Sequence, residues 1–232
     1  MIFRGKGSII LVLMLCLAML TAGVAYGKSD VDGKKEKFKN GYYEAVASAE
    51  QLKTLNQLYG KEITYGELIQ AVYPEALDYI PEKTKQEMYQ TPVEWASGED
   101  GSKSKTNDGA SLRKENSDIG ALAIITIGHE SNISKDSTGI DYDSGSRVWT
   151  PHPWYRIPKM SVISNLERSG GGFVASRFAT GTNVYAISAA GRYSNPTNGS
   201  YRTVGQHWGE YPVGYEPPTY SNITYTSWIT VP

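Results

Sequence analysis

Strand-length segments separated by turn residues fill the second half of this chain, and they restrict its fold more than any other feature. Apolar runs or two-residue alternations occur over 160–166, 173–178, 184–193, 201–208 and 223–231. Because no helical segment connects successive runs, we expect them to pair as antiparallel strands. The pattern predicts an antiparallel β-sandwich, immunoglobulin-like or related, over 119–232, with a barrel as the alternative.

Two further segments complete the expected β domain. Residues 121–127 form a short run that is apolar except for Thr126 and ends at Gly128, which indicates a buried strand with His129 following it. Three prolines fall within 211–218. They predict a loop there, because proline cannot donate the hydrogen bond that a central strand needs.

A helical spacing of apolar residues begins at Tyr42 and predicts three to four short helices across 42–90. Gly60 is a suitable end for the first of these helices. Thr64 and Glu67 have the Thr-x-x-Glu spacing of a capping box, in which each side chain accepts a hydrogen bond from a free backbone amide at a helix start. The first part of the chain is therefore expected to be a small helical unit.

Residues 96–118 differ in composition from both neighbours. Ala110 and Leu112 are the only hydrophobic residues from 97 to 118. A segment of this kind cannot bury enough apolar surface to offset the entropy lost on ordering. We expect a disordered linker over 96–118 that joins a helical unit at 42–95 to a β-sandwich domain at 119–232, which makes the fold class α+β.

The N-terminus has the organisation of an export signal. Arg4 and Lys6 precede an apolar run over 9–22, and small residues follow before a cleavage point after residue 27. This order predicts a secretory signal peptide over 1–27, with an uncleaved membrane anchor as the alternative, and a charged leader over 28–41. The mature protein is then expected to be secreted or extracytoplasmic, with association with the cell surface as a further option.

Cys16 is the only cysteine, and it lies within the predicted signal peptide. The mature chain would therefore contain no disulfide, no thiol nucleophile and no cysteine-ligated zinc. Charge is uneven along the chain, since residues 144–232 hold seven basic and three acidic residues, a net charge of +4. Export excludes genomic nucleic acid as the target of this positive half.

Aromatic residues give the clearest indication of a binding role. The chain has 17 tyrosines and five tryptophans against four phenylalanines. Rings with a polar tip supply rigid contact area on recognition surfaces, although they also fill the cores of sandwiches. We expect loops at 149–155 and 207–211 to carry the ligand-binding residues, which are Trp149, His152, Trp154, Tyr155, His207, Trp208, Tyr211 and Tyr215.

The function expected from these features is a non-catalytic binding module for a cell-wall polymer, a glycan or a surface protein. Contact with a membrane is expected only through an uncleaved signal segment, and no cofactor is expected. One alternative is a secreted hydrolase with a site near His207 and Glu210, to which His129 could contribute, although the sequence identifies no catalytic residue. A second alternative is a structural component of the cell envelope.

A calcium site is the one metal site that the sequence offers. Asp136, Asp141 and Asp143 lie close together in a glycine-bearing segment, and carboxylate oxygens are the ligands that calcium prefers. Their spacing does not match the calcium-loop pattern, so solvated loop aspartates are the simpler interpretation. The three histidines, His129, His152 and His207, match no known spacing of metal ligands.

Overall fold

The computed structural model describes residues 41–95 and 124–232. The predicted signal peptide, the leader apart from residue 41, the predicted linker and the first part of the run at 121–127 lie outside the described residues. Within the described ranges, no helix is long and apolar enough to cross a bilayer.

The first described segment contains one strand followed by short helices. The elements are β1 (Tyr42–Val46), α2 (Ala49–Leu58), α3 (Tyr65–Val72), the 3₁₀ helix η1 (Pro74–Tyr79) and α4 (Glu82–Gln90). The second segment is built of strands, namely β2 (Thr126–Lys135), β3 (Gly139–Thr150), β4 (Ile157–Arg168), β5 (Gly172–Val184), β6 (Ala186–Ser194), β7 (Gly199–Glu210), β8 (Thr219–Tyr225) and β9 (Ile229–Val231).

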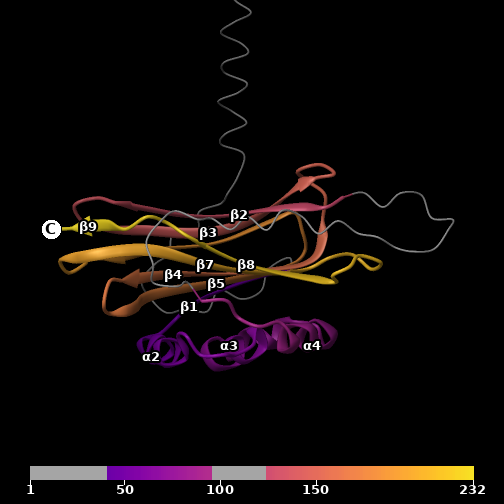
Figure 1. Cartoon of the computed structure of the whole chain (residues 1–232), viewed down its shortest axis with the longest axis horizontal. Helices are drawn as coiled ribbons and strands as arrows, with labels where there is room; N and C mark the ends of the chain where they lie inside the picture. Colours follow the sequence, from indigo (N-terminus) through magenta and orange to yellow (C-terminus); the bar gives the residue numbers. More distant parts are fainter. Residues whose placement is uncertain (1–40, 96–123) are drawn as a thin grey trace, which may run out of the picture. The chain divides into compact units, whose positions relative to one another are not determined.

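The strands form two antiparallel sheets. The larger sheet has six strands in the order β1-β5-β4-β7-β8, with β9 pairing to β7, and the smaller one has the order β2-β3-β6 (Figure 1). The α+β class with an antiparallel sandwich is thereby confirmed. The two sheets remain separate, so the barrel alternative is wrong.

The helices form a third layer on the open face of the larger sheet (Figure 1). Successive residues of a strand point to opposite faces, and β4 illustrates the result. Ile163 packs with Leu68 of α3 and Met88 of α4, whereas Val162 packs with the smaller sheet. All three layers belong to one compact unit of the chain, and the helices share a hydrophobic core with the sheet.

The predicted capping box at the start of α3 is present. The Thr64 side chain accepts from the backbone amide of Glu67, whose side chain accepts from the amide of Thr64. A second box, between Ser48 and Gln51 at the start of α2, was not predicted.

The prediction of helix from Tyr42 is wrong, because residues 42–46 form strand β1. This strand pairs with β5, with Tyr42 opposite Gly181 and Val46 opposite Arg177. Burial alternates along it, with Tyr43 buried and Glu44 exposed. The free edge of β5 supplies hydrogen-bond partners to a segment that is rich in strand-favouring tyrosine and valine.

Two strand boundaries also differ from the prediction. Gly128 does not end a strand, since β2 begins at Thr126 and continues to Lys135 with His129 inside it. The expected loop at 207–211 is wrong as well, because β7 continues to Glu210. There β7 is held on both sides by β4 and β8, and the chain leaves the sheet only where Pro212 could not donate to the ladder.

The space between the sheets is apolar at its two ends and polar in the middle. One end holds a cluster around Ile127, Met160 and Val162, and the other holds Ile140 and Leu166. Between them lie buried hydroxyl and imidazole groups, which are described below.

Candidate functional site

One end of the sandwich gathers loops from both sheets. Thr126 lies opposite Thr150, Ile157 opposite Val184, and Glu210 opposite Thr219. The chain before β2 and the β3–β4, β5–β6 and β7–β8 connections therefore meet at the same end, on the right of the view in Figure 1. The apolar inter-sheet cluster around Met160 lies beneath them.

Exposed apolar side chains concentrate at this end. Five of the eight large hydrophobic side chains that are exposed in the described residues lie here: Ile124 (62%), Trp149 (61%), Trp154 (68%), Tyr185 (37%) and Val213 (93%). The other three are on β1, on α4 and before β9. We call these five residues, with the exposed Arg147 and Arg156, the aromatic end.

The Trp149 ring packs on the outer face of the smaller sheet. A Cβ atom built on Gly128 would lie 2.5 Å from atoms of the indole, so the ring covers the place where a side chain would be. Gly128 faces outward on β2, since its neighbours Ile127 and His129 point toward the larger sheet. The ring therefore lies against backbone with much of its surface open to solvent.

The β3–β4 loop presents Trp154 on a supported turn. The amide of Tyr155 donates to the carbonyl of His152 at 3.0 Å, and their rings meet edge to face with centroids 5.7 Å apart. Tyr155 also packs against the buried cluster that contains Tyr215. These contacts tie the loop that carries the exposed indole to the core.

Arg156 and Tyr185 were not predicted to be functional residues. The Arg156 guanidinium lies 5.6 Å from the centroid of the Tyr185 ring and donates to the carbonyl of Asn183 at 2.6 Å. Tyr185 occupies a one-residue break between β5 and β6. The sequence signal for this break was weak, because Val184–Tyr193 is a continuous strand-length run.

The eight predicted ligand-binding residues separate into two groups. Trp149, His152, Trp154 and Tyr155 lie at the aromatic end, where all but the half-buried Tyr155 are exposed. The other four, His207, Trp208, Tyr211 and Tyr215, are buried, which contradicts their expected place on a surface. The indole of Trp208 faces the helices and donates to the Thr91 hydroxyl at 3.2 Å.

Tyr211 and Tyr215 belong to the buried cluster beneath the aromatic end. Their rings stack with centroids 6.1 Å apart, and Tyr211 contacts Tyr220, which in turn contacts His129. Burial raises the pKa of Tyr211 to about 12, so its hydroxyl stays protonated. This row of rings continues inward to the polar middle of the sandwich.

Seven side chains in that middle region form one continuous series, which we call the inter-sheet hydrogen-bond chain. In order they are His129, Ser146, His207, Thr224, Ser131, Ser144 and Ser164, with neighbouring atoms 2.6–3.1 Å apart. Five strands from both sheets contribute to it. Gly205 leaves room for it, since a Cβ there would lie 2.6 Å from three of its hydroxyl oxygens.

One arrangement of protons satisfies the whole chain. Ser144 donates to Ser164, so Ser144 must accept from Ser131, which must accept from Thr224. Each hydroxyl has a single proton. Nε2 of His207 therefore donates to Thr224, its Nδ1 accepts from Ser146, and Ser146 accepts from Nδ1 of His129.

Both imidazoles in the chain are neutral at pH 7. Burial lowers the pKa of His129 to about 4. Burial also lowers the pKa of His207 well below its usual range, and the neighbouring His129, at a ring-centroid distance of 4.9 Å, lowers it further. A second proton on His207, at Nδ1, would turn the atom that accepts from Ser146 into a donor, so this arrangement of protons would no longer hold.

His207 and Glu210 do not form the site that the hydrolase alternative requires. They are three residues apart on one strand, so they point to opposite faces of the sheet. The Glu210 carboxylate accepts from the Thr84 hydroxyl at 3.0 Å on the helical side, whereas His207 faces the other sheet. Lys159 is buried opposite Glu210 in the strand register, and burial lowers the pKa of its amine to about 8.

The three aspartates proposed for calcium lie at the end opposite the aromatic end. Arg192 contacts Asp136 and Asp141, each at 2.7 Å, and Asp143 accepts from Asn132. The Arg192 guanidinium and the Thr138 amide hold the pKa of Asp136 well below its usual range. No group of three or more metal-ligating side chains occurs in the described part of the chain.

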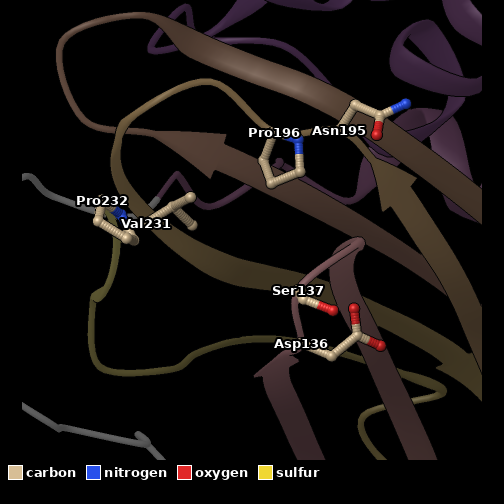
Figure 2. A pocket seen from close by; sticks show the side chains of 6 residues that line it. All are labelled: Asp136, Ser137, Asn195, Pro196, Val231 and Pro232. Carbon is tan, nitrogen blue, oxygen red and sulfur yellow. The ribbon is translucent and has the colours of Figure 1, made fainter.

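A shallow depression of about 400 Å³ is lined in part by Asp136. Figure 2 shows that it lies between the β2–β3 turn, the β6–β7 turn and the last residues of the chain. Its lining residues are Asp136, Ser137, Asn195, Pro196, Val231 and Pro232.

Comparison of the chain with protein-family models, with curated proteins and with solved structures finds no match.

Proposed function

We propose that this chain is an exported, non-catalytic binding module that attaches to the cell envelope through its aromatic end. The partner classes expected from the sequence are a cell-wall polymer, a glycan and a surface protein. The observation that carries the proposal is the concentration of exposed, supported aromatic rings at one end of the sandwich.

Exposed apolar side chains of this size are costly unless they meet a partner. Single exposed hydrophobic residues are normal, but a group at one end of a domain is typical of an interaction surface. The Trp149 ring packs on Gly128, and Trp154 lies in a turn that contacts the buried core through Tyr155. Rings held in this way lose little entropy when they bind.

The export part of the proposal is supported by the sequence of residues 1–27. The non-catalytic part is supported by the separation of His207 from Glu210 on opposite faces of β7. The histidine side chains that contact serine, His129 and His207, belong to the inter-sheet hydrogen-bond chain. In that chain His207 is fully buried and has no carboxylate partner among its contacts.

Retention on isolated envelope material tests the proposal. The double variant Trp149→Ala/Trp154→Ala removes the two exposed indoles, and we expect the fraction of protein retained on isolated cell envelopes, which contain both wall and membrane, to fall about tenfold or more. The matched control is Val46→Ser/Tyr89→Ala, which removes exposed apolar side chains from β1 and α4. Equal retention of both variants, with the fold intact by circular dichroism, would remove the aromatic end from the function.

A further inference from the structure

We propose that the aromatic end docks on the surface of an anionic lipid bilayer. This inference rests on the proposed function for the surface that attaches, but it names the lipid bilayer as the partner in place of the polymer, glycan or protein expected from the sequence. It is carried by the mixture of side chains at this end, which includes aliphatic tips and arginines as well as rings.

The aliphatic side chains distinguish a bilayer from a polysaccharide. Val213 is 93% exposed and lies within a tight turn, in which the amide of Tyr215 donates to the carbonyl of Pro212 and Gly214 has a φ of +95°. Ile124 is 62% exposed just before β2. Neither side chain can stack on or hydrogen-bond to a sugar, but both gain free energy by entering hydrocarbon.

The aromatic side chains match the zone between headgroups and hydrocarbon. Trp149, Trp154 and Tyr185 each combine a large apolar ring with a hydrogen-bonding group, the composition that is enriched where proteins meet the membrane interface. Trp149 lies near the end of β3, Trp154 in the β3–β4 loop and Tyr185 between β5 and β6, while Ile124 and Val213 lie before β2 and in the β7–β8 loop. A set of separate projections fits a soft surface that can close around each of them.

The charges at this end favour anionic headgroups. Arg147 and Arg156 are both exposed, and the exposed acidic residue of the β7–β8 loop is Glu216. Arg156 is held beside the Tyr185 ring, so a guanidinium lies next to an aromatic group at headgroup depth. Basic residues beside interfacial aromatic residues strengthen binding to anionic lipid.

The opposite end of the sandwich provides an internal comparison. Its turns, at 136–138, 169–171 and 195–198, carry none of the large exposed hydrophobic side chains found in the described ranges. Exposed Asp136 and Asn195 and the half-buried Pro196 line the depression there. The described turns of the two ends therefore differ, because most of the exposed large hydrophobic side chains lie at the aromatic end together with Arg147 and Arg156, as expected of a domain that meets a membrane in a single orientation.

Co-sedimentation of the full chain with vesicles tests the inference. We expect binding to vesicles that contain phosphatidylglycerol, with much weaker binding to phosphatidylcholine alone and a decrease at high salt. Val213→Ser should weaken binding about tenfold, because it removes a side chain that enters hydrocarbon. Val46→Ser is the matched control and should bind as the unaltered chain does, because Val46 is exposed on β1, outside the aromatic end.

Two outcomes would overturn the inference. If the chain fails to bind either kind of vesicle while Trp149→Ala/Trp154→Ala still lowers retention on isolated cell envelopes, the bilayer is wrong and the proposed function stands. If Val213→Ser and Val46→Ser bind vesicles equally, attachment occurs through another part of the chain. A third result would reject the proposed function together with the inference: Trp149→Ala/Trp154→Ala changes neither the retention on isolated cell envelopes nor the binding to vesicles.

Discussion

Neighbouring residues of β7 have opposite environments because of the pleat of the strand. His207 joins the inter-sheet hydrogen-bond chain, and Trp208 packs among the helices on the other face. Both residue types are common at binding surfaces, yet both are fully buried here. At the scale of the residue, the face on which a side chain lies decides its role more than its chemical type.

The two buried imidazoles predict that stability falls with acidification. A histidine in the unfolded chain has a pKa of about 6.5, whereas the pKa of His129 in the fold is about 4 and that of His207 is also lowered. Below pH 6.5 the unfolded state therefore binds more protons than the native state. The contribution of the two neutral imidazoles to the free energy of unfolding should be complete above that pH. Below it, the free energy of unfolding should decrease by up to about 1.4 kcal/mol per pH unit for each imidazole.

Urea unfolding at pH 7, 6 and 5 measures this dependence. His129→Gln should reduce the slope of unfolding free energy against pH, because one of the two groups is removed. His152→Gln alters an exposed histidine and serves as the control. If the slope is the same in both variants and in the unaltered chain, the buried imidazoles do not control acid stability.

At the scale of the element, an ion pair joins the two central strands of the larger sheet. Nε of Arg202 on β7 donates to the Glu167 carboxylate on β4 at 2.6 Å, and both side chains are nearly buried. Tyr59, which follows α2, donates to the same carboxylate at 3.4 Å. The Trp228 ring lies 4.6 Å from the guanidinium, so the pair also anchors the segment before β9.

Removal of one partner from this pair should be strongly destabilising. Glu167→Leu leaves the Arg202 guanidinium buried without its carboxylate, and we expect a loss of about 3–5 kcal/mol in unfolding free energy. Glu167→Leu/Arg202→Leu should cost less than the sum of the two single variants, since no buried charge remains. Denaturant unfolding of all four proteins gives the coupling energy, and purely additive losses would contradict a paired site.

At the scale of the whole molecule, the helices and the larger sheet share one hydrophobic core. Leu68, Ile69 and Val72 of α3 lie in the same buried cluster as Ile163 of β4 and Phe178 of β5. Tyr73 adds a polar link, because its hydroxyl and that of Ser176 on β5 are 2.6 Å apart. A helical layer attached in this way cannot separate without exposing one face of the sheet.

The shared core predicts a single unfolding transition. Helical signal from far-ultraviolet circular dichroism and tertiary signal from the buried Trp208 should change together on heating. Leu68→Ala should shift both curves to lower temperature by the same amount, because it creates a cavity in the common core. Loss of helical signal at a lower temperature than tertiary signal would mean that the helices unfold independently.

The sequence by itself determined the short-range features of this protein. A capping box needs only Thr64 and Glu67 at a fixed spacing, and a strand needs only a run of suitable residues between turns. The α+β class, most of the strands and four residues at or beside the aromatic end could therefore be predicted. Residues 42–46 were missed because the free edge of β5, far along the chain, decides that they form a strand.

Only the tertiary structure decided which chemical groups meet. The inter-sheet hydrogen-bond chain combines seven side chains from five strands, and no local sequence pattern predicts such an assembly. Tyr185 and Val213 became surface residues, and Trp208 and Tyr211 became core, through the order and register of the strands. The physical reason is that burial depends on contacts between distant segments, whereas helix caps and strand runs depend on neighbours along the chain.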